Sequence, residues 1–318
     1  MINKPKQYFA IALEPIHVGT GGQRLGRVDM TVVREPVSKV PYIPGTSLSG
    51  TLKYFADFTL RDKNIKEEIC ASTQGSRHKN HDHEVCPICV AFGYTPQDEE
   101  SGKGSAQGLL HFSDALLLAS PVNTANGPVW LTSPRRLHNI LGIGEGGDFD
   151  EDTFALPADS AIKTSASLND RLNFGWVLLD KNKNPFSSVD ELKKAGIEEN
   201  CASRFVVVAE WLFSQLVNDN MEVRTSVVID PETGAASDGG LFTFEAIPRG
   251  AIFSFDIVEH DYYGRWSKIQ WNNGEEIPPS ATDMIEEYSF DGIKFIGLGG
   301  MTTRGFGCLH IKPRDNKQ

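Results

Sequence analysis

Two glycine-rich segments near opposite ends of the chain restrict its fold more than any other feature. The first covers 19–26 with the sequence GTGGQRLG, and the second covers 297–307 with the sequence GLGGMTTRGFG. Glycine lets backbone N–H groups approach a phosphate closely, and a neighbouring arginine adds charge-assisted hydrogen bonds. Neither segment matches the Walker or the dinucleotide-binding fingerprint. The segments therefore predict either a phosphate-binding surface or tight turns that need positive φ.

Hydrophobic periodicity predicts an α+β fold. Alternating apolar residues predict a strand over 7–18, and a helical apolar period predicts a helix from Thr46 or Ser47 to about 61. The other expected elements are strands at 109–118, 204–208, 225–229 and 251–258, a helix at 209–217, and two strands within 294–311. Two amphipathic helices among strands are typical of an antiparallel sheet covered on one face. Of such folds we choose the ferredoxin-like, or RRM-like, arrangement.

Two long polar stretches interrupt this pattern and are expected to be insertions into a single domain that spans 1–318. Residues 64–108 are rich in His, Gly, Ser and Asp and are too long for a simple connection. Residues 120–178 are loop-like, with an acidic run at 148–152 that could also be a disordered loop. The second stretch keeps apolar residues without an evident core: Ile140, Leu141, Ile143, Phe149, Phe154 and Leu156. We expect 120–178 to project toward a partner surface.

The cysteines predict a metal site in the first insertion. The chain has five cysteines, and their odd number and uneven spacing argue against a disulfide framework. Cys86 and Cys89 form a CxxC pair, preceded by Cys70 and by histidines at 78, 81 and 83. Three thiolates and one imidazole complete a tetrahedral structural Zn²⁺ site, so the candidate ligands are Cys70, His83, Cys86 and Cys89. The alternative is a pair of buried thiols beside a solvated His-rich loop.

The charge of the chain limits how it can bind a polyanion. A net charge of −11 counts against non-specific binding, which depends on neutralisation of phosphates by Lys and Arg. Arginines do concentrate beside glycines, at 24, 27, 135, 136 and 304, so a local positive groove on an acidic body is expected, with ordinary surface arginines as the alternative. The chain lacks an apolar run long enough to cross a bilayer and lacks a signal-peptide pattern. We therefore expect a cytoplasmic protein without membrane contact.

Short motifs along nearly the whole chain resemble one family in order and spacing. The amino-terminal motifs are HVGTG at 17–21, LGRVD at 25–29, VREP at 33–36 and PYIPGTSLSGTLK at 41–53. The later motifs are PVWLTSPRRL at 128–137, RT at 224–225, IDPETG at 229–234, GLF at 240–242, IPRG at 247–250, GG at 299–300 and TRGFG at 303–307. Together they resemble the RAMP-superfamily backbone subunits of type III CRISPR effector complexes, and most closely the fourth-subunit family of the type III-B (Cmr) assembly. The cysteines depart from that pattern and are similar to those of equivalent subunits in other type III complexes.

The resemblance implies a ferredoxin-like palm that stacks head-to-tail with copies of itself along a guide RNA, beside other type III effector subunits. Each copy inserts a hairpin thumb between guide and target RNA, and we expect this thumb within 120–178. In the family, an aspartate after the first glycine segment cleaves target RNA at regular intervals with Mg²⁺ or another divalent cation, and Asp29 has the matching position. Judged from the residues alone, Asp29 is more often a turn residue or a salt-bridge partner.

The expected RNA contacts are glycines, hydroxyls and cations in these motifs. They are Gly19, Gly21, Arg24, Arg27, Ser47, Lys53, Arg135, Arg136, Gly299, Gly300, Thr303 and Arg304. Trp130, Trp211, Cys201 and Cys308 are expected to be buried instead. The leading functional hypothesis is an RNA-guided endoribonuclease subunit. The alternatives are a non-catalytic RNA-binding scaffold subunit and a stand-alone metal-dependent hydrolase of a small molecule.

Overall fold

The structure is a computed structural model of the chain. It describes residues 4–21, 28–66, 69–70, 82–95, 105–147, 149–150, 152–163, 170–271, 274 and 276–314, without the side chains of 237–239. The helices are α1 (Gly45–Asp62), α2 (Pro87–Phe92), α3 (Pro134–Arg136), η2 (Leu137–Leu141), α4 (Val189–Lys194), α5 (Glu199–Ala202), α6 (Glu210–Asp219), η4 (Trp266–Lys268), α7 (Ala281–Phe295) and η5 (Thr302–Arg304). Within these ranges, no helix is both long enough and apolar enough to cross a bilayer.

The strands form one large sheet and three small ones. They are β1 (Lys6–Ala12), β2 (Tyr42–Ile43), β3 (Gly93–Tyr94), β4 (Ala106–Gln107), β5 (Leu110–Phe112), β6 (Ala115–Thr124), β7 (Gly127–Thr132), β8 (Thr153–Phe154), β9 (Arg171–Phe174), β10 (Val177–Lys181), β11 (Phe205–Val207), β12 (Glu222–Ile229), β13 (Ala236–Ala246), β14 (Ile252–Glu259) and β15 (Leu309–Pro313). The large sheet has the order β11-β7-β6-β14-β1-β15, and the mixed α+β fold is confirmed.

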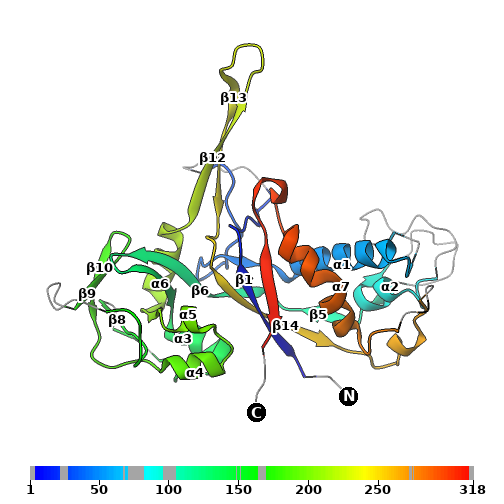
Figure 1. The fold of residues 1–318 in the computed structure, drawn as a ribbon, viewed down its shortest axis with the longest axis horizontal. Helices are drawn as coiled ribbons and strands as arrows, with labels where there is room; N and C mark the ends of the chain where they lie inside the picture. The colour runs from blue at the N-terminus through cyan, green and yellow to red at the C-terminus, as the bar shows by residue number, and fades with distance from the viewer. Residues whose placement is uncertain are drawn as a thin grey trace.

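At the centre of the large sheet, β1 pairs antiparallel with both β14 and β15. The Tyr8 ring of β1 stacks on Phe255 of β14 at 5.3 Å and meets Phe290 of α7 edge-on at 5.7 Å. Helix α7 therefore lies over the centre of the sheet, with α1 beside it (Figure 1). Along the chain, the central elements follow the order β1, α1, β6, β14, α7 and β15.

Helix α1 was predicted correctly from its apolar period, whereas α7 was missed. In α1, Leu48, Leu52 and Leu60 are fully buried, as the period requires. The expected pair of strands over 294–311 is wrong, because α7 extends to Phe295 and only β15 follows the glycine segment as a strand. The two helices touch closely, since a Cβ at Gly292 of α7 would lie 2.3 Å from Cγ of Phe55.

The segment 120–178 does not expose the apolar residues that were expected to seek a partner. Ile140, Leu141 and Ile143 pack into one core cluster of the chain together with Phe9 and Phe205. Phe154 and Leu156 are buried in the main core. The small sheet β8-β10-β9 lies in the lobe of the molecule that also contains α3 to α6 (Figure 1). The reason given for placing a thumb at 120–178 is therefore wrong, because these side chains find their core within the chain itself.

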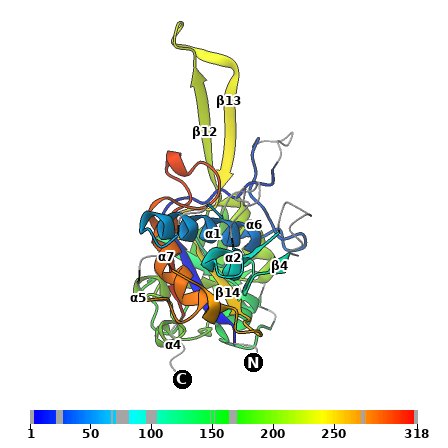
Figure 2. The same ribbon diagram turned by 90° about the vertical axis from the view of Figure 1, so that its right-hand side faces the viewer.

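A different element projects from the body. Strands β12 and β13 pair antiparallel into a long hairpin that extends well beyond the large sheet (Figures 1 and 2). Its turn is held by Asp230, whose Oδ1 accepts the N–H of Glu232 at 2.8 Å and of Thr233 at 3.3 Å. Ile229 and Leu241 are 56% and 63% exposed, so this hairpin carries apolar residues into solvent.

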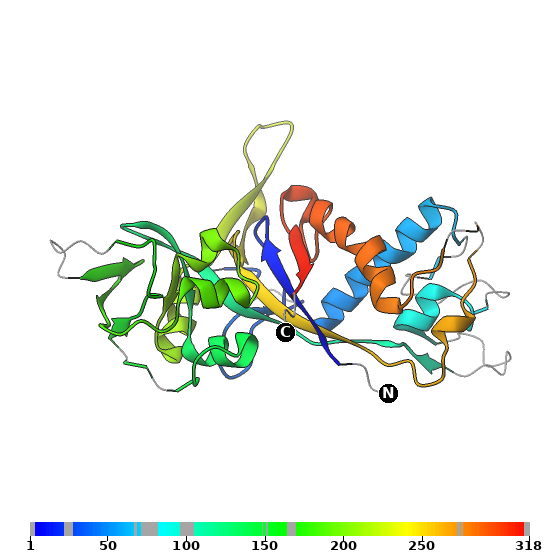
Figure 3. The same cartoon turned by 60° about the horizontal axis from the view of Figure 1, so that its bottom comes forward.

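The described part of the insertion at 64–108 packs against α1. Its described elements are α2, β3 and β4, and α2 packs beside α1 at the end of the molecule away from the β8-β10-β9 sheet (Figure 3). Ile88 and Val90 of α2 are fully buried in the main core. This packing fixes the start of α2, where the CxxC pair lies.

Candidate functional site

Asp29 lies at the root of the projecting hairpin. Its Oδ2 accepts the backbone N–H of Thr243 at 2.7 Å and the Thr243 hydroxyl at 3.0 Å. The next residue, Met30, donates its N–H to Thr243 O and accepts the N–H of Glu245, so the loop runs alongside β13. The hydrogen bonds from Thr243 hold the pKa of the Asp29 carboxyl below its ordinary value. Asp29 is therefore an ionised, oriented carboxylate at the base of β13.

The two glycine segments meet around His17. The N–H of Gly300 donates to His17 O at 2.9 Å, and a Cβ at Gly299, where φ is +88°, would lie 2.5 Å from the same oxygen. On the other side, a Cβ at Gly19 would lie 3.0 Å from His17 Nε2. Glycine is thus required at position 299 by close packing between segments almost the whole chain apart, whereas a Cβ at Gly19 would crowd only the His17 side chain. Gly19 and Gly299 remain exposed, so their other side stays accessible.

Buried polar residues tie this junction to the hairpin. His17 Nδ1 lies 2.6 Å from the carbonyl oxygen of Glu245, so that nitrogen must carry the proton and donate it. The Glu245 carboxylate accepts from Arg34 at 2.5 Å and from the N–H of Val32 at 3.2 Å. Both His17 and Glu245 are buried. The sequence motifs included His17 and Arg34, but nothing in them indicated that Glu245 and Thr243 would complete the site.

Aromatic packing fixes the second glycine segment to the same root. Phe306 is buried against Phe244 of β13, with ring centroids 5.3 Å apart, and the guanidinium of Arg224 in β12 lies 4.6 Å from the Phe306 ring. Met30 and Met301 pack against this cluster. The root of the hairpin is therefore a rigid junction of the Asp29 loop, both hairpin strands and the carboxy-terminal glycine segment.

The residues expected to contact RNA fall into four groups. Six are exposed: Gly19, Gly21, Arg135, Gly299, Thr303 and Arg304. Three are partly buried: Ser47, Lys53 and Gly300. Arg24 and Arg27 lie outside the described residues, and Arg136 is buried. The exposed members of both glycine segments lie around one junction, whereas Arg135 belongs to α3 in the lobe away from α1 (Figure 1).

Arg136 is held by its own chain, which argues against the expected RNA contact. It donates to the Leu117 carbonyl at 2.8 Å and lies 3.7 Å from a Glu35 oxygen and 3.6 Å from a Glu210 oxygen. Its guanidinium also lies 4.9 Å from the Phe213 ring. Burial lowers the pKa of Arg136, although the two carboxylates oppose this effect. Arg136 is a structural cation that joins α6 to the large sheet.

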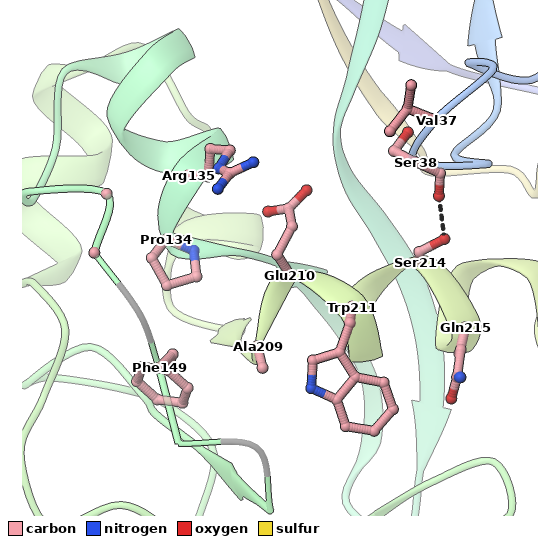
Figure 4. A pocket seen from close by; sticks show the side chains of 12 residues that line it. Val37, Ser38, Pro134, Arg135, Phe149, Ala209, Glu210, Trp211, Ser214 and Gln215 are labelled. Carbon is pink, nitrogen blue, oxygen red and sulfur yellow. Dashed lines mark hydrogen bonds between the residues drawn. The ribbon is translucent and has the colours of Figure 1, made fainter.

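A surface hollow of about 620 Å³ lies beside this cation. Arg135, Glu210 and Trp211 line it, together with the 95% exposed Val37 on the facing loop (Figure 4). The expectation that Trp211 is a core residue is wrong, because α6 turns Leu212, Phe213 and Leu216 inward and leaves Trp211 46% exposed. Trp130, in contrast, is partly buried and donates its indole N–H to Gly250 O at 2.8 Å.

Three predicted metal ligands come together at the start of α2. The sulfur atoms of Cys70, Cys86 and Cys89 all lie within 4.8 Å of one another, and all three residues are buried. Cys86 is the N-cap residue of α2 and Cys89 lies in its first turn, while Cys70 follows α1 in the chain and places its sulfur 3.6 Å from that of Cys86. Three converging buried thiols are a donor set that suits a soft or borderline divalent metal.

His83 is adjacent to the cluster but is not one of the mutually close ligands. Its Nδ1 lies 3.3 Å from Cys89 Sγ, and its ring stacks on Tyr94 at 4.4 Å. Hydrogen bonds from Cys70 and Cys89 lower the pKa of the Cys86 thiol well below its usual range, against the effect of burial. The other candidate histidines, His78 and His81, lie outside the described residues.

The two remaining cysteines are buried as expected. Burial raises the pKa of the Cys201 thiol and of the Cys308 thiol to about 11 each. Both are thus protonated at neutral pH and separate from the metal cluster.

Comparison with known proteins identifies the family. The model of the RAMP superfamily matches residues 10–310 of the chain. The chain belongs to the RAMP superfamily. Among characterised members, this RAMP protein is 25% identical to the CRISPR system Cmr endoribonuclease Cmr4 of Pyrococcus furiosus, over 95% of this chain and 93% of that protein.

Solved structures agree on the fold of this RAMP protein. A chain of the type III-B Cmr-beta complex bound to cognate target RNA matches with a TM-score of 0.66 and 16% identity, covering 98% of each chain. Oligomeric Cmr4 from Pyrococcus furiosus matches with a TM-score of 0.58 and 17% identity, covering 98% of this chain and 99% of that one. The predicted membership of the RAMP superfamily is confirmed, and the chain is similar to Cmr4 in sequence and in fold.

Proposed function

We propose that this RAMP protein is an RNA-binding backbone subunit of a type III CRISPR effector complex and that it cleaves target RNA through Asp29. The observation that carries the proposal is the Asp29 carboxylate, fixed by two hydrogen bonds from Thr243 at the root of an exposed hairpin. Similarity over nearly the full length to a protein named as an endoribonuclease supports the same activity.

The proposed chemistry needs only a positioned carboxylate and a divalent cation. Both hydrogen bonds from Thr243 fall on Oδ2, and among the described residues no hydrogen bond reaches Oδ1. Oδ1 is therefore available to hold Mg²⁺ or to accept the proton of a ribose 2′-hydroxyl. A bound divalent cation would stabilise the charge that develops on the phosphate.

We assign the palm and the thumb as follows. The order β1-α1-β6-β14-α7-β15, with β1 between β14 and β15, supports a ferredoxin-like palm. The β12–β13 hairpin, rather than 120–178, is our candidate for the thumb, because it projects from the body and carries exposed apolar residues. Apolar wedges open nucleic-acid steps in many complexes.

The guide backbone would follow the exposed glycines and cations at the hairpin root. Gly19, Gly299 and Arg304 offer backbone N–H groups and one positive charge on the same junction, while Lys53 and Ser47 lie on α1. Arg24 and Arg27 stay candidates from the sequence. The proposed partners are guide and target RNA, further copies of this chain in a head-to-tail row, and other effector subunits, a proposal that the oligomeric relative and the target-bound complex support. A cytoplasmic location stays a prediction from the sequence.

The cysteine cluster is proposed to hold structural Zn²⁺. The residues that would hold it are Cys70, Cys86 and Cys89, with His83 as the fourth ligand. Four protein ligands leave no open position for water, so the metal would stabilise the 64–108 insertion and would take no part in cleavage.

The decisive experiment compares wild type and Asp29→Ala in the assembled complex. Loss of cleavage with retained guide and target binding supports the catalytic assignment. Unchanged products support the alternative, a non-catalytic scaffold subunit. A wild-type protein that purifies without RNA and fails to bind it would overturn both and favour a small-molecule hydrolase.

A further inference from the structure

A buried ion pair stands directly behind the cysteine cluster. The ammonium of Lys66 lies 2.5 Å from Asp57 Oδ1 and 3.4 Å from Cys70 Sγ. Lys66 and Asp57 are 5% and 1% exposed. The Asp57 carboxylate also accepts the backbone N–H of Cys70, at 3.2 and 3.3 Å. One pair therefore contacts both the backbone and the sulfur of the same cysteine.

Cys70 is the ligand that most needs such support. Cys86 and Cys89 lie at the start of α2, whose first turn fixes their spacing. Cys70 instead belongs to no helix or strand, so only contacts of its own side chain and backbone can hold its sulfur beside the others. Apart from the contact with the Cys86 sulfur, contacts of this kind come from Asp57 of α1 and from Lys66 just before the cysteine.

We propose that Lys66 and Asp57 position Cys70 as a metal ligand and that the Lys66 ammonium compensates the charge of the thiolate cluster. This inference rests on the metal site proposed above. The pair acts through Cys70 and does not touch the metal itself. A second layer of hydrogen bonds of this kind orients the first ligands and tunes the affinity of many metal sites.

The charges of the described groups balance only when Lys66 is included. A divalent metal with three thiolates and a neutral imidazole carries one net negative charge. Arg61 Nε lies 3.5 Å from Asp57 Oδ2, so Arg61 opposes the charge of Asp57 from the surface side. The Lys66 ammonium contacts both Asp57 and Cys70 Sγ, so it opposes the charge of the carboxylate and of the cluster together. Burying an anionic cluster without such a partner is costly.

A purely structural role is the alternative, in which the pair only ties α1 to the following loop. The two roles differ in what Lys66→Met changes. If the pair supports the metal site, the variant loses metal affinity. If it is structural only, the metal-free and metal-loaded proteins lose the same stability and the affinity for metal stays the same.

The test is a competition titration of Zn²⁺ against a chromophoric chelator, with the full chain. We expect Lys66→Met to weaken Zn²⁺ binding by about 10- to 100-fold, the usual effect of removing a partner of this kind. Lys66→Arg keeps a charged donor and should restore most of the affinity. The matched control is Lys268→Met, which removes an exposed lysine of η4, beside α2, and should leave the affinity unchanged.

Substitution with Co²⁺ checks that the ligands themselves survive. The visible absorption bands of Co²⁺ bound to Lys66→Met should keep the wild-type pattern, because the same four side chains bind the metal. Equal Zn²⁺ affinity in wild type and Lys66→Met overturns the proposal for Lys66 but leaves the metal site intact. A wild-type protein that binds no Zn²⁺ removes the site and this inference together.

If Lys66→Met does not fold, the wild-type protein still decides. Lysine side chains labelled with ¹⁵N give NMR signals for a buried ammonium, and Cd²⁺ is a suitable probe metal for a thiolate site. We expect the Lys66 signal to shift when Cd²⁺ is added to the metal-free protein. A Lys66 signal that is identical with and without bound Cd²⁺ overturns the contact with the cluster.

Discussion

Asp29 and Thr243 lie 214 positions apart in the chain, and the carboxylate of one accepts both the backbone N–H and the hydroxyl of the other. The amide of Asp29 returns a hydrogen bond to the Thr243 hydroxyl at 3.2 Å. A loop beside the first glycine segment and a strand of the projecting hairpin are thereby joined at one point. The orientation of the proposed catalytic group therefore depends on the hairpin root.

Removal of either partner tests this dependence. We expect Asp29→Ala to lower the rate of target cleavage by at least about 100-fold, the typical minimum contribution of a general base. Thr243→Val keeps the backbone hydrogen bond and loses the hydroxyl, so we expect a smaller loss of roughly tenfold through misplacement of the carboxylate. Labelled target RNA resolved on gels measures both rates. Equal losses in the two variants would show that Thr243 does more than orient Asp29.

The lowered pKa of Asp29 predicts a pH dependence of stability. The carboxyl is ionised in the folded protein at pH values where an ordinary aspartate, with a pKa of about 3.9, becomes protonated. Its contribution to folding is then fully present above about pH 5 and is lost as the pH falls through the folded pKa. The difference in free energy of unfolding between wild type and Asp29→Asn should therefore shrink below about pH 4. Urea unfolding at several pH values measures it, and a difference that grows toward low pH contradicts the assigned direction.

Two deletions separate the hairpin from the segment first expected to be the thumb. Deleting 231–236 at the turn of β12–β13 removes exposed residues only, so the chain should fold normally, while the regular spacing of cleavage products should change. Deleting 155–167 removes the buried residues Ala155, Leu156 and Ile162. Loss of even one such Leu or Ile side chain costs about 2–5 kcal/mol, so this deletion should impair folding. Thermal unfolding and product mapping report on the two effects, and a hairpin deletion with wild-type products would remove its assignment as the thumb.

The metal site predicts a defined zinc content. Purified wild-type protein should carry about one Zn²⁺ per chain, as a single four-ligand site requires. Cys86→Ser should release the metal and loosen the 64–108 insertion, with little direct effect on cleavage. Cys308→Ser is the matched control, because Cys308 is also a buried thiol but lies outside the cluster. Elemental analysis decides first, and less than about 0.2 Zn²⁺ per chain makes the site untenable.

Arg304 and Arg136 should respond differently to substitution by glutamine. Arg304 is exposed on η5, so Arg304→Gln should weaken RNA binding and reduce the slope of log affinity against log salt by about one. Arg136→Gln should instead lower the free energy of unfolding by about 1–3 kcal/mol, because Glu35 and Glu210 lose their buried partner. Binding titrations at several salt concentrations and urea unfolding test the pair. An Arg136→Gln protein with wild-type stability and weaker RNA binding would reinstate Arg136 as an RNA contact.

The sequence was sufficient to predict the elements whose pattern is local. The apolar period of α1 and the CxxC pair of α2 both appear in the structure where they were expected. Helix α7 was missed because its buried positions, such as Met284 and Ile285, alternate with acidic residues and precede a glycine run that indicated strands. The failed interpretation of 120–178 has a related cause, because whether an apolar residue has a core depends on segments distant in sequence.

The candidate catalytic residue was predictable only through the family resemblance. Asp29 has no local signal, since the residue that fixes it is Thr243 on a distant strand. Lys66 likewise reads as a surface cation within a polar stretch, and only the folded chain places it between Asp57 and Cys70. Tertiary contacts of this kind leave no periodicity or spacing in the sequence.

The hydrogen-bonded root of the hairpin has a consequence for any assembly of identical copies. The path from Asp29 to the hairpin turn runs through Thr243 and along β13 alone, so its length is the same in every copy. A row of such chains would repeat its carboxylates with the period of the row, and each carboxylate would keep a constant offset from the hairpin of its own subunit. The interval between cuts on a bound strand would then be a property of the subunit's dimensions and independent of the nucleotide sequence.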